Sequence, residues 1–195
     1  MKNVRLFIAM DFSNQTILEV TNFQAQLRRE LSNVPIRWVA PETMHLTLQF
    51  LGEVPQSQIP AIQEAISASA AGFSSIPVHI ASVGGFPSFK KPQVLWLGIS
   101  ADKKLKKLAS QLQSALQPLG FKPEKEFMPH LTLGRMNRTA NGEQQKMVSA
   151  VLARWQSVEI GQDRMREVIL YQSDLTQKGP IYTSLFRFPL KNVLN

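Results

Sequence analysis

Two of the three histidines in this chain begin the same tetrapeptide. The sequence His-Leu-Thr-Leu occupies positions 45–48 and again positions 130–133. With average residue usage, a given histidine is followed by Thr at the second position and Leu at the third about once in 200 cases. For two of three histidines to share that pattern by accident, the chance is on the order of one in ten thousand. The repeat therefore indicates two related segments with one task.

Each tetrapeptide has the pattern of a strand with one polar and one apolar face. Side chains alternate along a strand, so His45 and Thr47 share a face, as do His130 and Thr132. The leucines point to the opposite face, where a core can bury them. Two such strands related by an approximate twofold axis would bring two imidazoles and two hydroxyls to one cleft.

This set of side chains suits the hydrolysis of a phosphodiester. Imidazole has an unperturbed pKa of about 6.5, so one neutral and one protonated ring can coexist near neutral pH. The neutral ring can take a proton from water, and the imidazolium can deliver one to a leaving oxygen. The two threonine hydroxyls can donate hydrogen bonds to the phosphate and hold it between the rings.

Two other interpretations compete with this one. Each histidine could be a structural residue at a strand end, which the repeated threonine disfavours. The pair could instead ligate a metal ion, but two histidines without Cys, Asp or Glu in the same motifs are a sparse ligand set for zinc. We therefore expect neither a metal nor another cofactor. His79, in the segment PVHIAS, lacks the threonine, and we interpret it as structural.

The composition is that of a globular protein with a basic surface. Of 195 residues, 44% are hydrophobic and 18% charged, which is ordinary for a folded domain. The formal net charge of +8 attracts polyanions, of which nucleic acid is the commonest, although solubility alone is an alternative reason for the charge. Cysteine is absent, which excludes disulfides and thiol catalysis.

The expected location is the cytoplasm. The apolar stretch Leu6–Met10 ends at Asp11, too early for the core of a signal peptide. No run approaches the roughly 18 apolar residues of a membrane helix. The absence of cysteine also suits a reducing compartment.

Strand-like and helix-like segments alternate irregularly, which predicts an α+β fold with antiparallel sheets. Ser13, Ser57 and Asp102 are the expected N-caps of three helices, and a fourth helix is expected at 143–155. A Gly- and Pro-rich loop is expected over 84–92. Strands are expected at 5–11, 36–39, 45–52, 77–83, 94–99, 130–136, 158–160, 167–173 and 182–190.

Longer segments around the two tetrapeptides resemble a known family. They are RLFIAMDF, WVAPETMHLTLQFLGE, VLWLG, FMPHLTLGR and LYQSDL…GPIYTSLFRFPL, in this order along the chain. Together they resemble the 2H phosphoesterases, and within them the RNA 2′,3′-cyclic phosphodiesterases, the LigT-type branch historically called 2′-5′ RNA ligase. The resemblance covers nearly the whole chain.

The resemblance implies a fold and a reaction. The fold would be a single bilobal domain over residues 1–195, with two pseudo-symmetric lobes, helices outside, and a basic cleft to which each lobe contributes one H-x-T-L strand. The substrate would be RNA with a 2′,3′-cyclic phosphate end, hydrolysed to a 2′-phosphate without a metal.

The resemblance also implies roles for single residues. His45 would donate a proton to the leaving 3′ oxygen, and His130 would accept one from water. Thr47 and Thr132 would bind the phosphate, and Arg135 would add positive charge. Strict alternation from His130 puts Arg135 on the leucine face, so its role requires a β-bulge at Gly134. Without that bulge Arg135 is a surface or lobe-bridging residue.

Several alternatives stay open at this point. The same bond chemistry run backwards would ligate RNA ends through a 2′-5′ linkage, and a vestigial site would leave an RNA- or nucleotide-binding module. Phe7, Trp38, Phe86 and Phe89 are candidates to stack a base, although apolar residues on strands or loops more often belong to the core. The sequence leaves open which RNA is used, tRNA fragments or short oligonucleotides among them. We expect a monomer, because the cleft needs no partner subunit.

Overall fold

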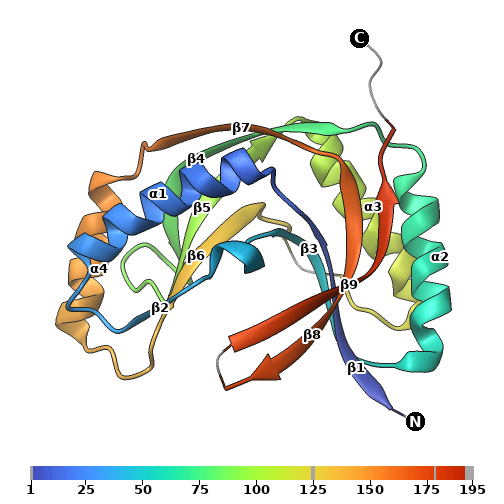
Figure 1. Cartoon of the computed structure of the whole chain (residues 1–195), viewed down its shortest axis with the longest axis horizontal. Helices are drawn as coiled ribbons and strands as arrows, with labels where there is room; N and C mark the ends of the chain where they lie inside the picture. The colour runs from blue at the N-terminus through green and yellow to red at the C-terminus, as the bar shows by residue number, and fades with distance from the viewer. Residues whose placement is uncertain (1, 124–125, 178, 192–195) are drawn as a thin grey trace.

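A computed structural model describes residues 2–123, 126–177 and 179–191 of the protein. These residues form one nine-stranded sheet flanked by helices (Figure 1). The strands are β1 (Asn3–Met10), β2 (Ile36–Trp38), β3 (Leu46–Pro55), β4 (Ile76–Phe86), β5 (Val94–Ala101), β6 (His130–Met136), β7 (Glu159–Met165), β8 (Glu167–Thr176) and β9 (Gly179–Pro189). The α-helices are α1 (Asn14–Glu30), α2 (Ile59–Ala70), α3 (Lys103–Leu116) and α4 (Gly142–Arg154).

The sheet consists of two halves that meet at β3 and β6. The strand order is β7-β4-β5-β6-β3-β1-β8-β9, and the short β2 also pairs with β6. A single residue pair, Leu46 opposite Leu131, joins the halves. Every ladder between named strands is antiparallel, which confirms the predicted α+β architecture.

The four α-helices do not all pack on the half of the sheet that is nearest to them in sequence. Helices α2 and α3 pack on the half made by β3, β1, β8 and β9, whereas α1 and α4 pack on the half made by β6, β5, β4 and β7 (Figure 1). Each half-sheet is thus covered by one helix from the N-terminal half of the chain and one from the C-terminal half. This exchange ties the two halves together beyond the single β3–β6 contact. Among the described residues, no helix is long and apolar enough to cross a membrane.

Two of the three predicted helix caps are confirmed. The Ser13 side chain accepts a hydrogen bond from the Thr16 N–H at the start of α1, and that of Asp102 accepts one from the Lys104 N–H at the start of α3. The prediction for Ser57 was wrong. A 3-10 turn (Gln56–Gln58) leads directly into α2, whose N-cap Gln58 makes no side-chain hydrogen bond. Pro60 in the first turn has no N–H, so fewer donors there need a cap.

The predicted loop over 84–92 was wrong in its first three residues, because β4 continues to Phe86. Gly84 lies directly opposite Trp96 on β5. A Cβ atom at Gly84 would lie 2.3 Å from the Trp96 ring. The glycine is therefore a strand residue that leaves room for an indole to cross it, not a turn residue.

The apolar faces of both tetrapeptides are buried as the alternation predicts. Leu46, Leu131 and Leu133 have no exposed surface, and Leu48 is 1% exposed. Each buried leucine side chain contributes about 1.5–3 kcal/mol relative to an exposed one. The core thus fixes which face of β3 and β6 is presented to the cleft.

Candidate active site

The two histidine–threonine pairs meet where the halves of the sheet join. Because Leu46 lies opposite Leu131, the antiparallel register brings His45 beside Thr132 and Thr47 beside His130. All four side chains line one cleft of about 590 Å³. The structure therefore brings together the four residues that the repeat singled out.

A β-bulge returns Arg135 to the cleft, as its predicted role requires. On the β5–β6 ladder Trp96 is opposite Thr132 but Leu95 is opposite Gly134, so β6 has one extra residue between them. The extra residue reverses the alternation after Thr132. Arg135 is exposed and lines the cleft with the two histidines.

Gly134 leaves room for β2 beside β6. A Cβ atom there would lie 2.8 Å from the Ile36 side chain and 3.0 Å from that of Trp38, both on β2. Any larger residue would push β2 away from β6. The glycine thus allows the pairing of β2 with β6.

The first tetrapeptide has the same bulge. On the β1–β3 ladder Ala9 is opposite Thr47 and Ile8 is opposite Gln49, so β3 also gains one residue after its threonine. Phe50 therefore occupies the position in β3 that Arg135 occupies in β6. Phe50 is 58% exposed and lines the cleft. The two strands are alike in shape, but one presents an aromatic ring and the other a cation.

The hydrogen bonds of the His45 and His130 rings determine which ring nitrogen is free for proton transfer. Nδ1 of His45 lies 2.8 Å from the Thr43 carbonyl oxygen, and Nδ1 of His130 lies 2.7 Å from that of Met128. A carbonyl oxygen can only accept, so each Nδ1 carries a hydrogen and donates it. The proton that each ring takes up or gives away is therefore the one on Nε2.

Aromatic rings hold the histidines in place. The centroid of Phe7 lies 4.9 Å from that of His45, and Tyr182 meets the same ring edge-on at 5.3 Å. Phe86 meets His130 edge-on at 5.0 Å. These contacts restrict the tilt of both imidazoles.

Most of the residues that the sequence suggested for base stacking do not present an open ring to the cleft. Phe7 lines the cleft but is only 2% exposed, since its ring packs against His45 and the two nearby tyrosines. Phe86 and Phe89 do not line the cleft, and Phe89 packs against the core. Trp38 does line it. The open ring is that of Phe50, which the sequence analysis missed.

Burial sets the direction in which the pKa of His45 moves. Loss of solvent around the ring lowers the pKa below the ordinary value of 6.5, and the positive charges of His130 and Arg135 lower it further. The hydrogen bond to the Thr43 carbonyl and the charge of Asp11 act in the opposite direction. Asp11 is thus the carboxylate that favours the protonated ring.

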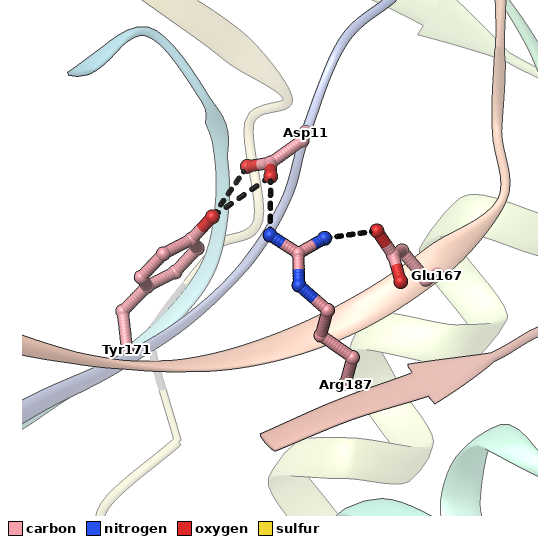
Figure 2. A network of polar contacts seen from close by, with 4 residues as sticks. All are labelled: Asp11, Glu167, Tyr171 and Arg187. Atoms are coloured by element: carbon pink, nitrogen blue, oxygen red, sulfur yellow. Dashed lines mark hydrogen bonds and ion pairs between the residues drawn. The ribbon is translucent and has the colours of Figure 1, made fainter. Parts of the chain in front are cut away.

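Asp11 belongs to a polar network with Tyr171, Arg187 and Glu167 (Figure 2). The Tyr171 hydroxyl donates to its carboxylate, at 2.9 Å from Oδ1 and 2.8 Å from Oδ2. Arg187 lies between Asp11, 3.7 Å away, and Glu167, with which it forms an ion pair. Burial, together with the bond to Asp11, raises the pKa of Tyr171, so the hydroxyl keeps its proton and stays a donor.

We expect Asp11→Asn to move the titration of His45 to lower pH. The asparagine oxygen still accepts from Tyr171, but the negative charge that stabilises the imidazolium is gone. The pH at which His45 titrates, followed by its imidazole NMR signal, should fall. Glu167→Gln is the control, because it breaks a neighbouring ion pair without removing a charge that acts on His45. An unchanged titration in Asp11→Asn would contradict the electrostatic role of this carboxylate.

His79, which the sequence predicts to be structural, lies outside the cleft. Its Nε2 is 2.5 Å from a carboxylate oxygen of Glu159 on β7. Within the described ranges, no group of three or more His, Asp or Glu residues is placed to hold a metal ion.

Other cleft residues were missed from the sequence, namely Arg5, Arg37 and Tyr182. Arg5 could have been found by counting two residues back from Phe7 on the same strand face. Arg37 and Tyr182 could not, because their places depend on pairing with strands that are distant in the sequence.

The two halves of the chain match one sequence family separately. The pattern described as LigT like Phosphoesterase matches residues 12–96 and, a second time, residues 97–182. The chain belongs to the LigT like phosphoesterase family. Each matched LigT like segment contains one tetrapeptide, which explains the repeat and the repeated bulge.

Curated relatives match the chain over nearly its full length. An RNA 2′,3′-cyclic phosphodiesterase of Archaeoglobus fulgidus is 36% identical over 183 residues, covering 93% of this chain and 98% of the relative. One of Methanothermobacter thermautotrophicus is 31% identical over 187 residues, covering 96% and 99%. Both relatives have the name that the sequence motifs suggested.

Solved structures have the same fold. The protein TT0787 of Thermus thermophilus superposes with a TM-score of 0.81 at 26% identity, covering 96% of this chain and 98% of that one. LigT of E. coli complexed with 3′-AMP superposes with a TM-score of 0.77 at 24% identity, covering 97% and 99%. The predicted fold with two repeated halves is thereby confirmed.

Proposed function

We propose that this protein is an RNA 2′,3′-cyclic phosphodiesterase that hydrolyses cyclic ends to 2′-phosphates. The observation that carries the proposal is the meeting of two identical histidine–threonine pairs in one cleft, each ring with its Nδ1 hydrogen donated to a carbonyl. The names of the relatives support the same reaction and the same substrate class. The formal net charge of +8 suits an RNA partner.

The proposed reaction is one displacement at phosphorus. Nε2 of His130 takes a proton from water as the water oxygen bonds to phosphorus. The bond from phosphorus to the 3′ oxygen breaks, and Nε2–H of His45 gives its proton to that oxygen. The products are a 3′-hydroxyl and a 2′-phosphate.

Thr47, Thr132 and Arg135 stabilise the negative charge of the bound phosphate. The hydroxyls of Thr47 and Thr132 donate to non-bridging oxygens, and Arg135 adds a positive charge to the same side of the cleft. The anionic substrate also acts on His45, because a nearby negative charge raises the pKa that burial has lowered. The acid form of His45 is thus favoured when substrate is bound.

The domain organisation follows from this chemistry. Residues 1–195 work as a single bilobal domain, in which each lobe contributes one H-x-T-L strand. The protein works as a monomer, because both histidines and both threonines come from one chain.

Phosphorus NMR of the reaction with a cyclic-ended RNA tests the function. The cyclic phosphate resonance should be replaced by that of a 2′-phosphate monoester. Binding without turnover would support the alternative of an RNA-binding module. A new 2′-5′ diester after addition of RNA with a 5′-hydroxyl would support the ligase.

Activity should survive exhaustive chelation. Two histidines and two threonines complete the proposed proton transfers and phosphate contacts without a metal. The measurement is the initial rate after dialysis against EDTA, compared with the untreated enzyme. If EDTA abolished turnover and zinc or manganese restored it, the acid–base assignment would fail.

A further inference from the structure

The two tyrosines of the chain lie on one face of the ladder formed by β1, β8 and β9. Phe7 on β1 lies opposite Tyr171 on β8. Tyr182 on β9 lies opposite Ser173, which is two residues further along β8. Residues directly opposite share a face of the sheet, and so do residues two apart on one strand. The pairing of β8 with both of its neighbours therefore brings Tyr182 to the face of Phe7, beside the cleft.

The two tyrosine hydroxyls differ in their partners. That of Tyr171 donates to the Asp11 carboxylate, so its hydrogen is already engaged. That of Tyr182 has no hydrogen-bond partner in the described part of the chain, and the residue lines the cleft. A phenolic hydroxyl that lines a cleft and has no partner can donate its hydrogen to a ligand.

The Tyr182 hydroxyl lies in positively charged surroundings and keeps its proton. Burial raises the pKa of Tyr182 above its ordinary value, whereas the charges of Arg135, Arg5 and Arg37 act in the lowering direction. The effect of burial is the larger, so the hydroxyl is a neutral donor near neutral pH. A neutral donor among three cations fits an anionic oxygen.

Tyr182 lies close to the residues that surround the reactive phosphate. Its ring meets that of His45 edge-on, with 5.3 Å between the centroids. The charge of Arg135 acts on the pKa of His45 and also on that of Tyr182. The proposed reaction places the phosphate between the two histidines with Arg135 beside it. The Tyr182 hydroxyl therefore belongs to the same group of phosphate contacts.

We propose that Tyr182 is a further catalytic residue, whose hydroxyl donates a hydrogen bond to a non-bridging oxygen of the reactive phosphate. This bond adds to those of Thr47 and Thr132, on the side where His45 protonates the leaving 3′ oxygen. Tyr182 keeps its proton throughout, so the proton balance of the two histidines is unchanged. The inference rests on the proposed function, because it takes the histidines as the site of the cyclic phosphate.

Removal of the hydroxyl alone tests the proposal. Tyr182→Phe keeps the ring that packs against His45 and Phe7, so the pH at which His45 titrates should stay as in the wild type. The value of kcat for a cyclic-ended RNA should fall about 10- to 100-fold, the usual effect of losing a hydrogen bond to a charged group. Ser184→Ala is the control, because it removes a hydroxyl from the same strand outside the cleft and should keep kcat.

An unchanged kcat in Tyr182→Phe would overturn the proposal. If the titration of His45 moved in that variant while the plateau of kcat stayed at the wild-type value, Tyr182 would only position the imidazole. A fall in kcat with an unmoved titration of His45 is the result that a direct contact with the phosphate predicts.

A measurement without turnover separates this proposal from the hydrolase itself. The probe is inorganic phosphate, added to protein whose tyrosines are isotope-labelled at Cζ, the carbon that bears the hydroxyl. The chain has two tyrosines, so Tyr171→Phe and Tyr182→Phe each remove one NMR signal and assign it. Phosphate should move the Tyr182 signal and leave that of Tyr171, whose hydroxyl is bound to Asp11, nearly in place.

The two measurements together distinguish the two possible failures. A Tyr182 signal that moves with phosphate in a protein without turnover would refute the hydrolase and keep the phosphate contact. Normal turnover, with an unmoved Tyr182 signal and an unchanged kcat in Tyr182→Phe, would refute the contact and keep the hydrolase.

Discussion

Replacing His45 or His130 by alanine is expected to lower kcat by about 10² to 10⁴, the usual contribution of a positioned acid or base. Each ring is placed by a carbonyl hydrogen bond and by aromatic contacts, so its Nε2 has a defined position in the cleft. No other imidazole lines the described part of the cleft. The measurement is single-turnover hydrolysis of a cyclic-ended RNA.

His79→Ala is the matched control for both variants. His79 is the third histidine of the chain and lies outside the cleft in an ion pair with Glu159. Its removal should leave kcat nearly unchanged, and the thermal midpoints of all three variants should show that they fold. Equal loss of activity in the three would mean that the repeated tetrapeptide does not mark the catalytic site.

Replacing Thr47 or Thr132 by valine should lower kcat by about 10² to 10³, as does loss of one donor to a developing negative charge. Valine keeps the branched shape and the strand preference of threonine, so the substitution removes only the hydroxyl. The loss should fall mainly on kcat, because negative charge on the non-bridging oxygens grows toward the transition state.

Thr183→Val is the control for the threonine variants. Thr183 is an exposed residue of β9 that does not line the cleft. Its substitution should change neither kcat nor KM. A threonine variant that raised KM alone would indicate ground-state binding and would contradict the proposed role in the transition state.

The strands that carry the chemistry were predictable because their pattern is local. Alternation from His45 and His130 places the leucines in the core, and side-chain caps at Ser13 and Asp102 begin their helices as expected. The sequence left two positions open for Arg135: the cleft face if β6 contains a bulge, and the opposite face if it does not. The register of β5 against β6 decides between them.

Other features depend on contacts that no local pattern reveals. The pairing of Arg37 with Arg135 arises from the register of β2 on β6, nearly a hundred residues apart along the chain. Gly84 resembles a loop residue until Trp96 is placed across it. The carbonyl acceptors of both histidine rings lie two residues before each motif, on backbone whose direction the side-chain sequence does not specify.

The pH dependence of kcat/KM in the two histidine variants tests the central assignment most directly. The intact enzyme should give a bell whose limbs belong to the coupled pair. Burial lowers the pKa of His45 in the free protein and bound phosphate raises it, so the alkaline limb of kcat should lie above that of kcat/KM.

The residual activity of each variant then identifies the acid and the base. His130→Ala should lose the acidic limb, where the base becomes protonated, and His45→Ala should lose the alkaline limb, where the acid loses its proton. Swapped limbs would reverse the two roles, and a flat profile in the intact enzyme would contradict the paired mechanism itself.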